Sequence, residues 1–179
     1  SVTLRGVVTE RGLRIGGVDV HHAPAESGND GRRELARRFS KGLWIDSPVL
    51  AVVYFRLFEF SKDDLLLYMS PIQELAMSHG DARAMLREAG GFIGNTYQRR
   101  ELTDAQSLET AELLARQNAR HSGWLKRTQR PRLFIGYLPI ADEMGHHYLG
   151  AALKGDSKAK ASLDWGWAII ERWSQEIAK

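Results

Sequence analysis

The sequence predicts an α+β fold in which a small, mostly antiparallel sheet packs against five to six helices. Apolar runs rich in β-branched and aromatic residues occur in the N-terminal segment and near 49–60 and 132–138, and these predict the strands. Most of the remaining chain spaces its apolar residues as a helix does. With 179 residues, 43% of them hydrophobic and 26% charged, a single globular domain over 1–179 can bury a sufficient core.

Strands are expected in three places. Residues 2–22 carry two apolar runs separated by a glycine-containing turn, which predicts a hairpin. The segment 49–60 is almost continuously apolar, as is typical of a central strand buried on both faces. The segment 132–138 is predicted to be a second core strand, ended by Pro139.

Helices are expected over much of the rest. Ser61, followed by Asp63 and Asp64, is typical of a helix N-cap with acidic residues in the first turn. Thr103, with Gln106 three residues later, predicts a capping box at the start of the longest helix. The expected helical segments are 32–41, 61–70, 72–89, 103–126, 141–153 and 158–178.

The composition excludes several classes of protein. There is no cysteine, which excludes a disulfide framework, a thiolate zinc site and a cysteine nucleophile. No apolar run reaches the roughly 20 residues that span a bilayer. The sequence contains no phosphate-binding P-loop, dinucleotide fingerprint or Gly-x-Ser-x-Gly motif. A net charge of +3 is compatible with nucleic-acid or anionic partners. Because the chain begins at Ser1, we expect a fragment or processed form of a longer chain.

Four of the six histidines form two adjacent pairs, and carboxylates lie close to each pair. Imidazole and carboxylate are the ligands used by zinc, iron and manganese sites. If the two pairs met in space they would form a site for zinc or manganese, and otherwise they are polar residues at the ends of elements. The predicted metal ligands are Asp19, His21, His146 and His147, and the predicted catalytic residues are His22 and Glu143.

The first histidine pair lies in a recognisable context. Segment 18–30, Val-Asp-Val-His-His-Ala-Pro-Ala-Glu-Ser-Gly-Asn-Asp, ends a predicted strand and continues into a proline-containing loop, a polar turn and a helix. This segment resembles the corresponding part of the HNH, or ββα-metal, nucleases. The resemblance implies His22 as the base that activates water and His21 or Asp19 as a metal ligand. Its chemistry would be hydrolysis of a metal-bound phosphate.

Basic residues gather in the stretches 32–41 and 99–132, and Tyr97 and Trp124 are aromatic neighbours able to stack on bases. Such a surface would face phosphates. Nearby glutamates leave open the alternative of a solvated helix face with local ion pairs. The predicted nucleic-acid-binding residues are Arg32, Arg33, Arg37, Arg38, Lys41, Arg116, Arg120, Lys126 and Arg127.

One short motif lies inside the second basic stretch. Residues 116–121, Arg-Gln-Asn-Ala-Arg-His, resemble the RNase motif of HEPN domains. The resemblance would imply RNA cleavage.

The C-terminal helix carries an unusual aromatic load, with Trp165, Trp167 and Trp173 close together. At helical spacing these residues fall on two apolar stripes, of which one must pack on the core. The other either extends the core or binds a protein partner or a second copy of the chain. Trp165 and Trp173 are the predicted partner-binding residues.

Three classes of function stay open. The favoured one is a nucleic-acid-facing protein, either a metal-dependent nuclease or an effector domain with a histidine-pair site. The alternative is a non-enzymatic interaction module or assembly component that uses the tryptophan-rich C-terminal helix. A remote third is a small-molecule or peptidoglycan hydrolase that uses Glu26, Asp142 or Glu143.

Overall fold

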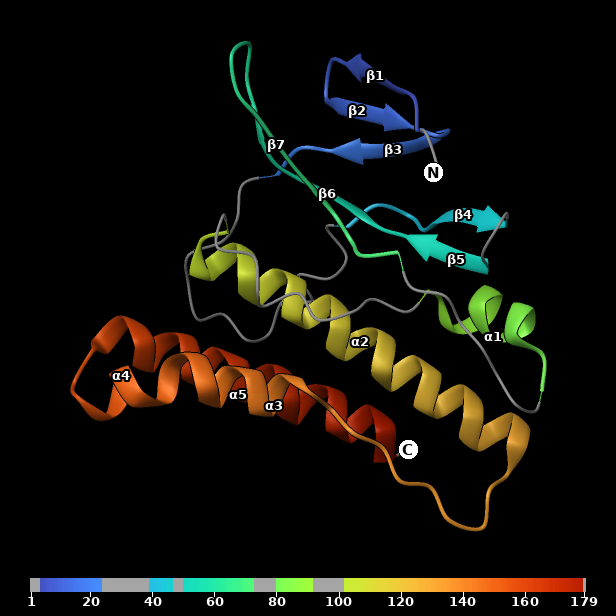
Figure 1. The fold of residues 1–179 in the computed structure, drawn as a ribbon, viewed down its shortest axis with the longest axis vertical. Coiled ribbons are helices and arrows are strands. Elements are labelled where there is room, and N and C mark those ends of the chain that lie inside the picture. The colour runs from blue at the N-terminus through green and yellow to red at the C-terminus, as the bar shows by residue number, and fades with distance from the viewer. Residues whose placement is uncertain (1–3, 24–38, 47–49, 73–79, 92–101, 179) are drawn as a thin grey trace.

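The computed structural model describes residues 4–23, 39–46, 50–72, 80–91 and 102–178. Its arrangement is α+β: the strands gather at one end of the molecule with α1 beside β5, and α5 with α3, η2 and α4 forms the other end (Figure 1). The long helix α2 crosses between these two layers. The strands are β1 (Gly6–Thr9), β2 (Gly12–Ile15), β3 (Val18–His21), β4 (Leu43–Asp46), β5 (Leu50–Val53), β6 (Phe55–Phe60) and β7 (Leu65–Met69). The helices are α1 (Ala82–Ala89), α2 (Asp104–Gln129), α3 (Ile140–Met144), η2 (Gly145–Leu149), α4 (Gly150–Leu153) and α5 (Ser157–Ala178).

The prediction of one small sheet with a strand near 132–138 is wrong. The described strands form three separate antiparallel sheets, β1-β2-β3, β4-β5 and β6-β7. The expected N-terminal hairpin therefore has a third strand. Residues 132–138 belong to none of these sheets, because their backbone pairs with no described strand.

The single strand predicted over 49–60 is divided between two sheets. Tyr54 separates β5 from β6, and its backbone N–H donates to the hydroxyl of Ser70 at 3.0 Å. The N–H of Phe55 likewise donates to the hydroxyl of Ser40 at 2.9 Å. Serine side chains thus take hydrogen bonds that a neighbouring strand would otherwise receive, so the ladder is interrupted at this point.

The helix predicted from Ser61 is also wrong, because β6 turns directly into β7 there. The Ser61 hydroxyl accepts hydrogen bonds from the N–H groups of Asp63 at 3.3 Å and Asp64 at 2.9 Å. The Ser61 N–H also donates to the Asp64 carbonyl at 2.8 Å. A serine followed by acidic residues makes the same local bonds in a turn as at a helix N-terminus, so the sequence signal was ambiguous.

The predicted number of five to six helices is too high for the described residues. They contain four helical bodies, because α3, η2 and α4 run on as one helix over 140–153 with a π-helical turn inside it. Of the segments expected to be helical, 32–38 and 73–79 lie outside the described residues, and 39–41 are not helical. Among the helices that are described, none is long and apolar enough to cross a membrane.

Two larger hydrophobic clusters hold the layers together. One lies between β6, α2 and α5 and includes Phe58, Leu113 and Ile169. The other lies among the strands and includes Val20 and Leu57. Both clusters receive side chains from β6, which therefore connects the N-terminal sheet to the helical layer.

Candidate functional site

The end of β3 places the first histidine pair against β6. His21 lies opposite Gly12 in the β2–β3 ladder, and the His22 N–H donates to the Arg11 carbonyl at 3.0 Å. His22 also forms an isolated parallel bridge with Leu57 of β6. Backbone bonds from two sides therefore fix the position of His22.

A β-bulge in β6 supplies the partner for the His22 ring. Leu57 pairs with Leu67 and Glu59 pairs with Leu66, so Phe58 has no opposite residue in β7. The Phe58 carbonyl instead lies 3.1 Å from Nε2 of His22. Bulges commonly change the direction of a group beside a functional site. No sequence pattern revealed this one.

The contact with Phe58 determines which nitrogen of a neutral His22 ring carries the proton. A carbonyl oxygen only accepts hydrogen bonds, so Nε2 must be the donor. Nδ1 of the neutral ring then has a free lone pair that can accept a proton or bind a metal. The ring is also held beside Phe60, with ring centroids 6.5 Å apart.

Two open clefts meet at the histidine pair, since His21 and His22 line both of them. The larger has a volume of about 590 Å³, and Lys41 and Ser40 stand on its wall. The smaller has a volume of about 420 Å³ and contains Arg11, Glu10 and Phe60. Each cleft is thus lined by one cation and one carboxylate beside the histidines: Lys41 and Asp19 in the larger, Arg11 and Glu10 in the smaller.

Asp19, the predicted third member of this group, is already engaged. Its carboxylate accepts a hydrogen bond from Arg14 Nε at 2.6 Å, and both side chains are exposed. The hydrogen bond from Arg14 lowers the pKa of Asp19, and the charge of that guanidinium acts in the same direction.

The second histidine pair lies on the helical stretch 140–153. His146 Nε2 is 3.3 Å from a carboxylate oxygen of Asp142, one turn earlier. Burial raises the pKa of Glu143, and the neighbouring Asp142 charge raises it further. One carboxylate oxygen of Glu143 is buried without a hydrogen-bond partner among the described residues. The His147 ring packs edge-on against Tyr148.

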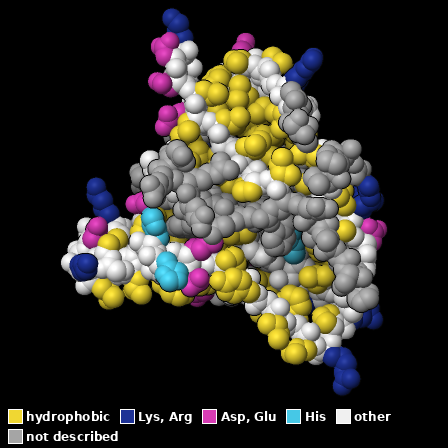
Figure 2. All heavy atoms as spheres, viewed as in Figure 1, with side chains coloured by type: hydrophobic (Ala, Val, Ile, Leu, Met, Phe, Trp, Pro, Cys, Tyr) yellow, Lys and Arg dark blue, Asp and Glu magenta, His cyan; other side chains and the backbone are white. Residues whose placement is uncertain are grey.

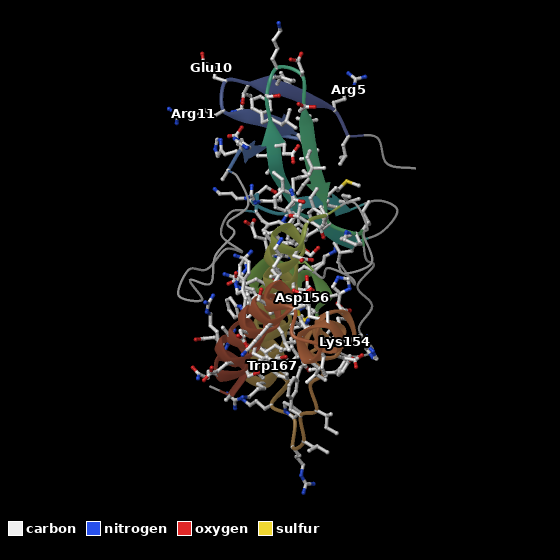
Figure 3. The ribbon with its side chains drawn as sticks, turned by 90° about the vertical axis from the view of Figure 1, so that its left-hand side faces the viewer. Arg5, Glu10, Arg11, Lys154, Asp156 and Trp167 are labelled. Carbon is white, nitrogen blue, oxygen red and sulfur yellow. The ribbon has the colours of Figure 1, made fainter. Side chains whose placement is uncertain are left out.

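The two pairs occupy different layers of the fold. β3 belongs to the strand end, whereas η2 packs on α5 at the opposite end, with α2 between them (Figures 1 and 3). Within the part of the chain that the structure describes, no three histidine or carboxylate side chains gather into a group able to hold a metal ion. Glu26 lies outside the described residues. The described residues thus do not assemble the zinc or manganese site considered from the sequence.

Part of the predicted phosphate-facing set lies outside the described residues, and the described members differ in exposure. Arg32, Arg33, Arg37 and Arg38 lie outside the described residues, as does Tyr97. Lys41, Arg120 and Arg127 are exposed, but Arg116 is only 8% exposed. Lys126 donates to the Ile177 carbonyl at 2.7 Å. Among the described side chains on the face in Figure 2, lysine and arginine project separately around the margin.

Burial also decides what the aromatic and HEPN-like candidates can contact. Trp124 is 3% exposed and donates to Glu88, so it cannot stack on a base. Of the motif residues, Arg116 and His121 are buried in the protein. Burial lowers the pKa of His121, whose Nε2 lies 2.8 Å from the Gly90 carbonyl. This motif therefore does not present its charged ends to a ligand.

The tryptophans of α5 divide between core and surface. Trp165 and Trp173 are 7% and 8% exposed and belong to the main hydrophobic cluster. Trp167 is the exposed one, at 52%. In the conformation described, the partner-binding role predicted for Trp165 and Trp173 would require both to leave the core.

A buried charge network on α2 was not expected from the sequence. Glu109 and Glu112 are fully buried, and they accept hydrogen bonds from Arg56 of β6 at 2.9 Å and from Arg172 of α5 at 2.6 Å. These bonds connect α2 to the layers on both sides. The available signal was Arg56 itself, a charge inside an apolar strand, which can be buried only with a partner.

Comparisons of the chain with protein-family models, with curated proteins and with solved structures find no match.

Proposed function

We propose that the chain is a nucleic-acid-facing protein whose clefts beside His21 and His22 receive a backbone phosphate. One observation carries the proposal: the bulge at Phe58 fixes His22 with Nδ1 as its proton-accepting nitrogen, at the meeting point of two clefts. Arg11 and Lys41, one in each cleft, would pair with the phosphate, beside Glu10 in the smaller cleft and Asp19, which is bound to Arg14, in the larger one.

His22 gives the proposed site a possible chemistry. A base that accepts a proton from water or a ribose hydroxyl assists cleavage of a phosphodiester, provided that it is within hydrogen-bond reach of the attacking oxygen. Nδ1 of His22 is suited to that role because Nε2 is already committed to Phe58. His21 lines the same two clefts as His22 and would contact the phosphate beside it.

The test is binding of fluorescently labelled single- and double-stranded DNA and RNA at several salt concentrations, measured by anisotropy. Arg11→Ala and Lys41→Ala should each weaken binding and reduce the salt slope by about one unit. Lys154→Ala is the matched control, because it removes the same charge from an exposed site at the opposite end of the molecule, where Figure 3 labels Lys154 far from Arg11. No binding at low salt, or equal losses in all three variants, would overturn the proposal.

Cleavage of the same oligonucleotides tests His22 separately. His22→Gln should abolish cleavage while binding persists, since glutamine cannot act as a base. Binding with no cleavage by the wild-type protein would support the phosphate clefts and refute the role of His22 as a base.

A further inference from the structure

The segment after α2 presents an unpaired apolar edge. Leu133, Ile135 and Tyr137 are 75%, 83% and 71% exposed, whereas Phe134 and Leu138 between and after them are half-buried. Alternation with a period of two is the pattern of an extended strand with one face buried and the other exposed. In Figure 1 this segment runs back from the C-terminal end of α2 toward α3.

The inner face of the segment is anchored. Phe134 and Leu138 line a pocket of about 300 Å³ together with Asn118 of α2 and Ser174 of α5, and Tyr137, although 71% exposed, borders the same pocket. Leu138 also packs against the main hydrophobic cluster. The segment is therefore held in place by α2 and α5 while its outer face stays open.

The backbone of this segment has no hydrogen-bond partner in the part of the chain that the structure describes. No backbone hydrogen bond joins residues 132–138 to any other described residue. The stretch 133–138 also contains no charged residue and no proline, the features with which edge strands usually avoid pairing with another chain. Three large exposed apolar side chains beside unpaired backbone groups form an edge that is ready for strand pairing.

We infer that a second copy of this chain covers the edge, by antiparallel pairing of segment 133–138 with itself. The charges of the two flanks favour a second copy in the antiparallel orientation. Arg130 and Arg132 precede the segment and are exposed, while the exposed Asp142 and the half-buried Glu143 follow it. Antiparallel pairing brings the basic flank of each copy toward the acidic flank of the other, whereas parallel pairing would place like charges together.

The apolar pattern also fixes the register. With Ile135 on the two-fold axis, each Leu133 faces Tyr137 of the second copy, so the three exposed side chains contact only one another. Residues directly opposite in an antiparallel pair have Cα atoms about 4.5–5.5 Å apart. The two copies of Leu133 would lie four residues out of register, at about 13 Å.

The chain's lack of cysteine allows a direct test of this register. A disulfide needs Cα atoms about 4.4–6.8 Å apart. Under mild oxidation, Ile135→Cys should therefore form a covalent dimer at least about 10-fold faster than Leu133→Cys, whereas Leu133→Cys/Tyr137→Cys should again cross-link rapidly. Equal rates for the two single variants would overturn the inferred pairing.

Sedimentation velocity over a range of concentrations tests the association itself. The wild-type chain should reach a dimer, and Ile135→Glu should stay monomeric at concentrations at least about 10-fold higher, because it places like charges together on the axis. Leu153→Glu is the control, since Leu153 is equally exposed, at 79%, but lies on α4. A monomeric wild type at every concentration, or equal weakening by both substitutions, would refute the inference. Circular dichroism of each variant distinguishes lost pairing from lost folding.

Discussion

Removing Arg56 alone should be among the most destabilising substitutions in this chain. Its side chain is fully buried, donates to Glu109 at 2.9 Å and to the Leu57 carbonyl at 2.7 Å, and lies over the Phe58 ring at 4.6 Å. Arg56→Met keeps much of the side-chain volume but leaves the Glu109 carboxylate buried without this guanidinium. A buried charge that loses its partner retains its full desolvation penalty.

The expected loss of stability in Arg56→Met follows from this burial. Removing one member of a buried ion pair costs about 3–5 kcal/mol. For a domain of this length, each kcal/mol lowers the melting temperature by about 2–4 °C, so Arg56→Met should lower it by about 6–20 °C. The double variant Arg56→Met/Glu109→Leu removes both charges and should recover most of this loss, because the space is refilled by apolar atoms.

Urea denaturation of the wild type, both single variants and the double variant measures the coupling between the two residues. The matched control is Arg14→Gln, which breaks an ion pair of similar length, 2.6 Å, whose members are 60% and 47% exposed. Its midpoint should not change measurably, since solvent screens an exposed pair. The reasoning from burial is refuted if Arg56→Met lowers the free energy of unfolding by no more than Arg14→Gln does. It is also refuted if the double variant is less stable than both single variants.

Two further predictions concern the helical layer. Burial and the charge of Asp142 raise the pKa of Glu143 above its ordinary value of 4.5, so the folded state holds this proton more tightly than the unfolded state, and the free energy of unfolding should fall as the pH rises from 4.5 through the raised pKa. Glu143→Gln should remove that part of the decline when the free energy of unfolding is measured from acidic to neutral pH. An unchanged pH dependence in this variant would contradict the prediction. Substitution by alanine should have opposite effects on stability at two helical glycines. Gly150 has open space beside it, so Gly150→Ala should raise the free energy of unfolding by about 0.5–1 kcal/mol. At Gly166 a Cβ would lie 2.9 Å from the sulfur of Met144, and this collision should lower the free energy of unfolding by about 1–3 kcal/mol, which exceeds the gain in helix propensity. Thermal unfolding of the two variants checks the difference in sign.

Sequence patterns predicted the elements whose signals are local. The capping box of Thr103 and Gln106 is present, with Thr103 accepting from the Gln106 N–H and Gln106 accepting from the Thr103 N–H. Helices α2 and α5 lie close to their predicted ranges. A cap and a repeated helical spacing are decided within a few residues, so they can be read without knowledge of the tertiary structure.

The misses depend on contacts that are distant in the sequence. Whether 133–138 becomes a core strand depends on a neighbouring strand, and the described residues provide none. The division at Tyr54 depends on hydroxyls of Ser40 and Ser70, which are remote along the chain. The bulge at Phe58 follows from the registry of β6 with β7. A sequence-based argument could therefore propose His22 as a base but could not find the carbonyl that selects its tautomer.

The two proposed surfaces can be tested independently because they lie at opposite ends of the fold. His22 is fixed by β6 within the strand layer, whereas Ile135 lies on the segment held by α2 and α5. Between them α2 is tied to both layers by the buried Glu109 and Glu112 bonds, so local changes at either surface should leave the other in place. Ile135→Glu should therefore change the oligomeric state without changing affinity per chain for a short oligonucleotide. A longer nucleic acid that spans both copies should bind the wild-type dimer more tightly than the monomeric variant, because the second contact becomes intramolecular. Loss of short-oligonucleotide binding in a folded Ile135→Glu monomer would instead show that the site at His22 needs the second copy.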